Sequence, residues 1–286
     1  MSEIKVAATQ MKCTQNLDEN IAAAEKLVLE SAGAGAQIIL LQELFETQYF
    51  CQTQSYEYLQ IAKTLEENRA INHFKTIAKK LGVVLPISFY ECCGNTAFNS
   101  IAVIDADGRI LGVYRKTHIP DGHFYEEKFY FTPGDTGFKV WQTAFGKIGI
   151  GICWDQWFCE AARIMTLLGA EILLYPTAIG CEPVLNTDTR KHWQIVMQGH
   201  AAANIIPVAA SNRIGTQKID GQEMTFYGNS FITNSIGEII CSMNDRDAGF
   251  IIASFDFEKI NMQRRQWGIF RDRRPEMYRE ILTHGF

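Results

Sequence analysis

Hydrophobic residues near the start of the chain form short continuous runs, separated by longer segments in which they recur every three or four positions. The continuous runs lie at 4–8, 37–41 and 83–89. Their length and aliphatic content predict buried strands, whereas the segments at 17–31 and 65–80 have the spacing of amphipathic helices. Asn16 and Glu19 suit the N-terminal cap of the first helix, and Gly82 ends the second. The pattern predicts a β-α-β-α-β start, typical of an α/β fold.

The same alternation continues through the rest of the chain. Strand-like runs at 100–104 and 109–115 predict a hairpin, because Asp107-Gly108 between them favours the positive φ of a tight turn. Further strands are predicted at 147–151, 171–175 and 205–211, helices at 158–168 and 189–204, and a β-rich stretch at 230–256. The segment 117–136 is weakly periodic and rich in Pro, Gly and aromatic residues, which predicts a long loop forming a pocket wall. Two β-α-β halves around a layered core are expected.

The chain of 286 residues has no tandem repeat of fixed period and no low-complexity linker. We therefore expect a single domain over 1–286. The segment from about 259 differs in composition, because several arginines alternate there with Trp267 and Phe270. Arginine and aromatic residues are enriched at protein interfaces. We predict that this tail lies at a subunit contact, and we consider nucleic-acid binding the less favoured alternative.

Composition narrows the functional classes. The net charge of -5 is spread along the chain, so no nucleic-acid partner is expected. The chain has no N-terminal signal run and no apolar stretch of transmembrane length, which predicts a cytoplasmic protein without membrane contact. Its eight cysteines include no C-x-x-C pair, and its histidines form no H-E-x-x-H motif. Without a dinucleotide or P-loop fingerprint either, we expect neither a metal nor a cofactor.

Cys153 is the candidate nucleophile. It ends a glycine-containing strand just before a predicted helix, where unpaired backbone N–H groups would favour a thiolate. The competing interpretation is a buried cysteine that packs as a small hydrophobe, which is the commoner fate of a cysteine. Glu43 ends another predicted strand, and open α/β sheets gather functional groups at strand ends. The pairing of a thiol with a carboxylate at such a crevice favours the catalytic interpretation.

Lys116 follows the predicted hairpin and completes the candidate set. Its ammonium group would stabilise the oxygen that becomes anionic when an amide or urea carbonyl is attacked, together with the backbone N–H after Cys153. A solvated surface lysine is the alternative. His118 and His123 lie nearby in the sequence, so a Cys-His pair remains possible beside a structural role for each histidine.

Three landmarks follow one another in the chain: Gln42-Glu43, Tyr114-Arg115-Lys116 and Gly151-Ile152-Cys153-Trp154-Asp155. With the longer stretches QELFETQYFCQ, YRKTHIPDG and CWDQWF around them, the chain resembles the nitrilase (carbon-nitrogen hydrolase) superfamily over nearly its whole length. The resemblance implies a four-layer α-β-β-α sandwich and a homo-oligomer. It also implies that Glu43 is the base, Lys116 the oxyanion partner and Cys153 the nucleophile, with Glu127 as a further catalytic glutamate. Substrate contacts are expected from Trp154, Tyr130 and His118.

The side chains that follow the nucleophile indicate the charge of the substrate. Members of the family that bind carbamoyl amino acids look as though they place arginines just after the nucleophile, where these would hold a carboxylate. This chain has Gln156 and Trp157 in that segment. Without a guanidinium fork a substrate carboxylate loses its best partner, and Glu182 suits a distal ammonium group instead. The resemblance therefore predicts a small cationic substrate, N-carbamoylputrescine, hydrolysed to putrescine, carbon dioxide and ammonia. The alternatives are another carbamoyl or amide substrate and a catalytically silent oligomeric binding protein.

Overall fold

The strands form two layers in the computed structural model, which describes residues 3–181 and 187–285. One layer contains β15 (Gly249–Phe255), β1 (Ile4–Gln10) and β2 (Ile38–Leu40), and a parallel bridge between Ile38 and Val84 joins it to β3 (Leu85–Cys93), β4 (Thr96–Ile104) and β5 (Ile110–Arg115). The other layer has the order β14 (Ile239–Ser242), β13 (Phe231–Thr233), β10 (Val208–Ser211), β8 (Ile172–Pro176), β7 (Gly146–Ile150) and β6 (Val140–Thr143). In both layers the central strands pair in parallel, and antiparallel strands lie outside them.

Alternation along β1 shows how the layers stack. Val6 and Ala8 belong to the apolar core shared with Ile148 and Ile172 of the other sheet, whereas Ala7 belongs to a second core on the outer face. Successive strand residues point to opposite faces, so a strand with both faces covered must be apolar throughout. This explains why the inner strands read as continuous hydrophobic runs.

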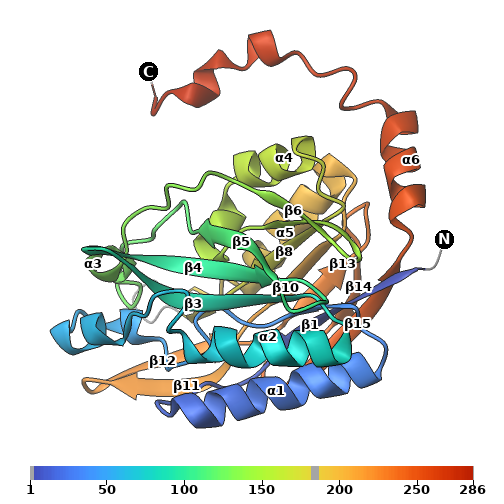
Figure 1. The fold of residues 1–286 in the computed structure, drawn as a ribbon. Helices are drawn as coiled ribbons and strands as arrows, with labels where there is room; N and C mark the ends of the chain where they lie inside the picture. The colour runs from blue at the N-terminus through green and yellow to red at the C-terminus, as the bar shows by residue number, and fades with distance from the viewer. Residues whose placement is uncertain (1–2, 182–186, 286) are drawn as a thin grey trace.

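Helices cover both outer faces (Figure 1). Residues of α1 (Leu17–Gly33) and α2 (Arg69–Leu81) form the core over the first sheet, and residues of α4 (Cys159–Leu167) and α5 (Arg190–Asn204) form the core over the second. The Asn16 side chain accepts from the N–H groups of Asp18 and Glu19, as a cap does. Gly82 ends α2 with a φ of 66°. The predicted α-β-β-α sandwich is confirmed.

Some elements differ from the prediction. The helix expected from 65 starts at Arg69, because the Asn68 side chain accepts from the Ile71 N–H at 2.8 Å and caps it there. The structure adds β11 (Ile214–Ile219), β12 (Gln222–Tyr227) and β9 (Gly180–Cys181), which form a small separate sheet, and α3 (Glu127–Tyr130) within the predicted loop. Short 3₁₀ helices occupy Phe50–Gln52, Tyr56–Ile61, Cys153–Trp157, Pro275–Met277 and Arg279–Leu282.

The C-terminal segment contains a helix that the sequence pattern did not predict. This helix, α6 (Phe257–Trp267), is capped by Asp256, whose carboxylate accepts from the Lys259 N–H at 2.9 Å. After α6 the chain leaves the sandwich and runs as an extended arm past α4 (Figure 1). Within the described ranges, no helix is both long and apolar enough to cross a membrane.

Candidate active site

Three predicted catalytic side chains meet where strands from both sheets end. Glu43 follows β2, Lys116 follows β5 and Cys153 follows β7, and all three are buried. The Lys116 Nζ lies 2.9 Å from Glu43 Oε1 and 2.6 Å from Glu127 Oε2, so one ammonium group bridges two carboxylates. The structure therefore brings together the four residues predicted to be catalytic.

The two oxygens of the Glu43 carboxylate differ in their hydrogen bonding. Asn99 Nδ2 and Lys116 Nζ donate to Oε1 at 2.7 and 2.9 Å. Oε2 is buried and accepts no hydrogen bond from any described residue. A buried acceptor without a donor is costly in a purely structural role. This oxygen is the one available to take a proton.

Glu127 completes the buried ion cluster. Its Oε1 accepts from the Tyr49 hydroxyl at 2.6 Å and from Lys116 at 2.9 Å. Burial raises the pKa of Glu127 to about 7, which the nearby Lys116 opposes and Glu43 reinforces. Burial alone would lower the pKa of Lys116, but Glu127 and Glu43 outweigh it and raise this pKa well above its usual value. Lys116 therefore keeps its charge.

Asp155 shapes the turn that carries the nucleophile. Cys153 has a φ of 40°, in the left-handed region that a non-glycine residue rarely occupies. Asp155 Oδ2 accepts from the Ile152 N–H at 2.9 Å and from the Tyr114 hydroxyl at 2.7 Å. Its Oδ1 accepts from the His118 N–H at 3.0 Å and lies 2.8 Å from His118 Nδ1. The carboxylate thus connects both sides of the turn and holds Cys153 in its strained conformation.

The surroundings of Cys153 disfavour a thiolate, whereas its place at the end of a strand is expected to favour one. Burial raises the pKa of this thiol well above its usual value, and the charge of Glu43 raises it further, against the smaller opposite effect of Lys116. The turn after Cys153 is a 3₁₀ helix of five residues, which offers less N-terminal stabilisation than the predicted helix would. The thiol rests protonated and needs a base at the moment of attack.

Cys153 opens on a pocket of about 240 Å³. Its walls are mainly aromatic and apolar, and the lining residues are Pro120, Tyr125, Cys153, Trp154, Trp157, Ile179, Thr189 and His192. Trp154, a predicted substrate contact, lies in this wall. Gln156 is fully buried behind it, where its Oε1 accepts from Trp193 Nε1 at 2.7 Å.

The other predicted substrate contacts are placed differently. Tyr130 is not in the pocket wall: it packs against Phe50, and its hydroxyl donates to the Thr53 carbonyl at 2.5 Å. His118 is not in the wall either, because its ring stacks on Phe158 at 3.6 Å between centroids. Both contacts instead support the loops around the site. Glu182 lies outside the described residues.

Several residues of the site were not predicted from the sequence. Asn99 and Tyr49 hold the two carboxylates, Asp155 holds the nucleophile turn, and Arg213 contacts the backbone at Glu43. Asp155 lies in a quoted landmark, so its position next to Cys153 was the available signal. The other three are distant in sequence from the residues they hold, and only the tertiary fold brings them close. In the part of the chain that the structure describes, no cluster of His, Cys, Asp or Glu suits a metal ion.

Comparison with known proteins places this geometry in a family. The chain is 54% identical over 287 residues to an N-carbamoylputrescine amidase of Oryza sativa subsp. japonica, covering 99% of this chain and 95% of the rice protein. It is 53% identical over 283 residues to a citrullinase of Francisella tularensis, covering 99% of each. A carbon-nitrogen hydrolase structure from Helicobacter pylori G27 superposes with a TM-score of 0.92 at 36% identity, over 99% of this chain and 100% of that one. The carbon-nitrogen hydrolase family pattern matches residues 5–265, and the chain belongs to this family of enzymes.

Proposed function

We propose that the protein hydrolyses N-carbamoylputrescine to putrescine, carbon dioxide and ammonia, with Cys153 as the nucleophile. The observation that carries the chemistry is the buried cluster in which Lys116 bridges Glu43 and Glu127, with a protonated thiol in the field of Glu43. The substrate is supported by N-carbamoylputrescine amidases from four plants, which are 53% or 54% identical to the chain over nearly its whole length.

The first step forms a covalent intermediate. Glu43 Oε2 takes the thiol proton as the sulfur attacks the ureido carbon, so the thiolate exists only during the attack. Lys116 and the Trp154 N–H stabilise the oxyanion that develops on the carbonyl oxygen. When the tetrahedral intermediate collapses, one carbon-nitrogen bond breaks, and the proton held by Glu43 passes to the departing amine or ammonia. A thioester-like acyl enzyme on Cys153 remains.

The second step releases the enzyme. Glu43 takes a proton from a water molecule, whose oxygen attacks the acyl carbon and forms a second oxyanion at the same position. The carbon–sulfur bond then breaks, and the proton returns to the sulfur of Cys153. The released carbamate decomposes to carbon dioxide and the second amine. Glu127 contributes by fixing the charged Lys116 through two short contacts.

Selectivity for a cationic substrate is supported by the pocket wall. The lining residues of the described pocket include aromatic rings from Tyr125, Trp154 and Trp157 but no arginine or lysine. An ammonium group is attracted to aromatic faces, whereas a carboxylate would be desolvated there without a partner. A carbamoylated diamine fits these walls better than a carbamoylated amino acid.

Citrulline is the second candidate, because the Francisella citrullinase is as similar to the chain as most of the plant enzymes are. This ureido compound carries both an ammonium and a carboxylate at its distal end. Arg190, next to the pocket residue Thr189, is the nearest guanidinium in sequence, but it forms a two-pronged contact with Asp188 at 2.6 and 2.9 Å. Because Arg190 already pairs with Asp188, it is a poor candidate for binding the carboxylate of a substrate.

The test compares N-carbamoylputrescine, citrulline and N-carbamoyl-β-alanine by ammonia release, with Cys153→Ser as the matched control. Cysteine-dependent release from the putrescine compound at the highest kcat/KM supports the proposal. Faster release from citrulline or the β-alanine compound overturns the substrate and keeps the chemistry. No release from any of them favours the silent binding protein.

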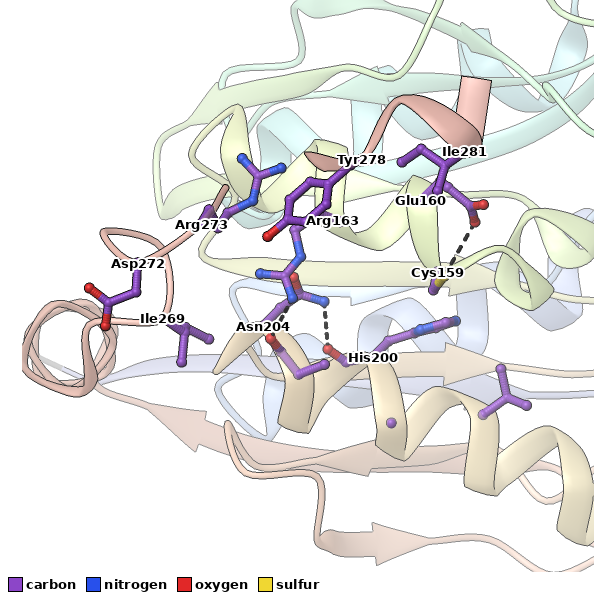
Figure 2. Close-up of a pocket in the computed structure, with 13 residues that line it drawn as sticks. Cys159, Glu160, Arg163, His200, Asn204, Ile269, Asp272, Arg273, Tyr278 and Ile281 are labelled. Carbon is purple, nitrogen blue, oxygen red and sulfur yellow. Dashed lines mark hydrogen bonds between the residues drawn. The ribbon is translucent and has the colours of Figure 1, made fainter. Parts of the chain in front are cut away.

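We also propose that the protein is a cytoplasmic homo-oligomer. All eight cysteines are free, which suits a reducing compartment. Large apolar side chains are exposed on α4, α5 and the C-terminal segment, including Trp267 at the end of α6, which is 74% exposed, and Leu282 in the arm, which is 85% exposed. A cavity of about 690 Å³ is lined by residues of α4 and α5, including Arg163 and Asn204, and by Arg273 and Tyr278 of the arm. Figure 2 shows these residues around it.

A second copy of the chain is the occupant we propose for this surface. A patch of this kind on a monomer would be costly in water, whereas an arm that extends from the body suits exchange between subunits. Light scattering is expected to give more than one chain per particle, and Trp267→Ser with Leu282→Ser to give smaller particles. A monomeric wild-type protein would contradict this assembly.

A further inference from the structure

Arg213 is a buried arginine whose hydrogen bonds all end on the backbone around Glu43. It follows β10, and only 1% of its surface is exposed. Its Nε and Nη2 donate to the Glu43 carbonyl at 3.2 and 2.9 Å, and Nη2 also donates to the Leu44 carbonyl. Its Nη1 donates to the Thr47 carbonyl at 2.9 Å. One guanidinium thus holds three carbonyl groups of the segment that carries the base.

A buried guanidinium normally has a carboxylate partner, because an unpaired charge is expensive to bury. Arg213 forms no salt bridge with any described residue. The rings of Tyr49 and Phe226 lie 5.9 and 5.7 Å from it, and the buried thiol of Cys13 lies within its electrostatic field. Carbonyl dipoles and aromatic faces compensate a buried cation only in part. The fold therefore retains a cation here at a cost to stability, which is expected where function requires it.

The backbone that Arg213 holds is itself strained. Leu44, directly after Glu43, has a φ of 47°, a conformation that leucine rarely adopts. The Leu44 N–H donates to Ser88 Oγ at 2.9 Å, and the Leu44 carbonyl accepts from Arg213. The turn is thus fixed from both sides, and the Glu43 side chain starts from a backbone that cannot relax.

We propose that Arg213 is a positioning residue for Glu43: its planar fork fixes the strained backbone from which the base extends. This inference rests on the proposed role of Glu43 as the base. A residue with this role affects kcat more than KM, and lysine in its place does not restore kcat, whereas a residue that only supports the fold affects stability alone.

The test separates positioning of the base from support of the fold. Arg213→Lys keeps the charge but has no planar fork to hold three carbonyls, so kcat is expected to fall about tenfold. Arg213→Met removes every side-chain hydrogen bond to these carbonyls, so kcat should fall about a hundredfold. KM should change little in either variant.

Arg264→Met is the matched control. Arg264 donates to the carbonyl of Ile205, another residue with positive φ, but lies in α6 away from the catalytic cluster. It should lower the thermal midpoint and leave kcat unchanged. Wild-type kcat in Arg213→Met or in Arg213→Lys, or a loss that falls on KM alone, would overturn the proposal. If Arg213→Met does not fold, the kcat of Arg213→Lys still decides.

Glu43→Gln keeps this test distinct from the proposed function. Its turnover, and the rate at which iodoacetamide labels Cys153, should fall to near background. Full turnover by Glu43→Gln would remove the base on which both proposals rest. Loss of turnover in Glu43→Gln together with wild-type behaviour of the Arg213 variants would overturn only the inference about Arg213.

Discussion

Glu127 offers a test of the buried ion cluster through the pH dependence of stability. Its side chain is fully buried, and its pKa is raised from 4.5 to about 7, first because of burial and then because of Glu43, against Lys116. Replacing Glu127 with glutamine removes the charge and the titration. It keeps the oxygen that Tyr49 and Lys116 contact, but its amide nitrogen replaces the oxygen that lies 2.6 Å from Lys116 Nζ, which costs stability to the same extent at every pH.

The magnitude follows from proton linkage. A carboxyl group with a folded-state pKa above its unfolded value binds its proton more tightly in the folded protein, so it contributes stability below pH 4.5 that is lost as the pH rises through about 7. At about 1.4 kcal/mol per pKa unit, wild-type protein loses about 3 kcal/mol by pH 8 that Glu127→Gln does not lose. Between pH 4.5 and pH 8, the free energy of unfolding of wild type should therefore fall by about this amount more than that of Glu127→Gln.

Urea denaturation at intervals from pH 4.5 to 8 measures this difference. Glu126→Gln is the matched control, because Glu126 is the partly exposed neighbour and bonds Gln54 rather than Lys116. It should show no pH-dependent gain. In the same preparations, kcat of Glu127→Gln should fall at least about tenfold, because Lys116 loses a charged partner. A difference in stability between Glu127→Gln and wild type that stays constant from pH 4.5 to 8 would refute the reasoning.

Three further predictions concern the nucleophile turn. Cys153→Ser should lower kcat by at least about a thousandfold in the ammonia assay while its circular dichroism stays that of wild type, because a hydroxyl is a poorer nucleophile than a thiol activated by Glu43. Asp155→Asn should lower the free energy of unfolding, measured in urea, by about 3 kcal/mol, because its amide would present a donor to groups that now donate to Asp155. A smaller loss would show that the turn needs no carboxylate. Gly151→Ala should cost about 1–3 kcal/mol, because its Cβ would lie 2.8 Å from the Tyr175 ring; an unchanged thermal midpoint would contradict the close packing.

The sequence predicted the elements whose signals are local. Continuous apolar runs predicted the inner strands, and Asn16 and Gly82 marked helix ends because a cap acts within a few residues. The hairpin of β11 and β12 was missed although a local signal was present: Asp220-Gly221 joins its strands as Asp107-Gly108 joins β4 and β5, and both residues of the turn have positive φ. The α2 start was also misplaced, because Asn68 competes with the helical spacing that begins earlier.

Residues of the site that have a local signal were also predictable from the sequence. Glu43, Lys116 and Cys153 each follow a strand and lie in landmarks, and the structure gathers them. Asn99, Tyr49 and Arg213 act on groups 56, 78 and 170 residues away, so no local pattern could connect them. The raised pKa of Cys153 could not be predicted from the sequence, because burial and the charge of Glu43 depend on the assembled core.

The active site is divided between the two sheets. Glu43 and Lys116 follow strands of one layer, Cys153 follows a strand of the other, and the apolar core containing Ile38 and Ile150 fills the space between them. Neither layer alone contains a complete set of reacting groups. Turnover therefore reports whether the two sheets have packed together. During refolding, activity should return only when the apolar core between the sheets has formed, later than the circular-dichroism signals of the helices and strands.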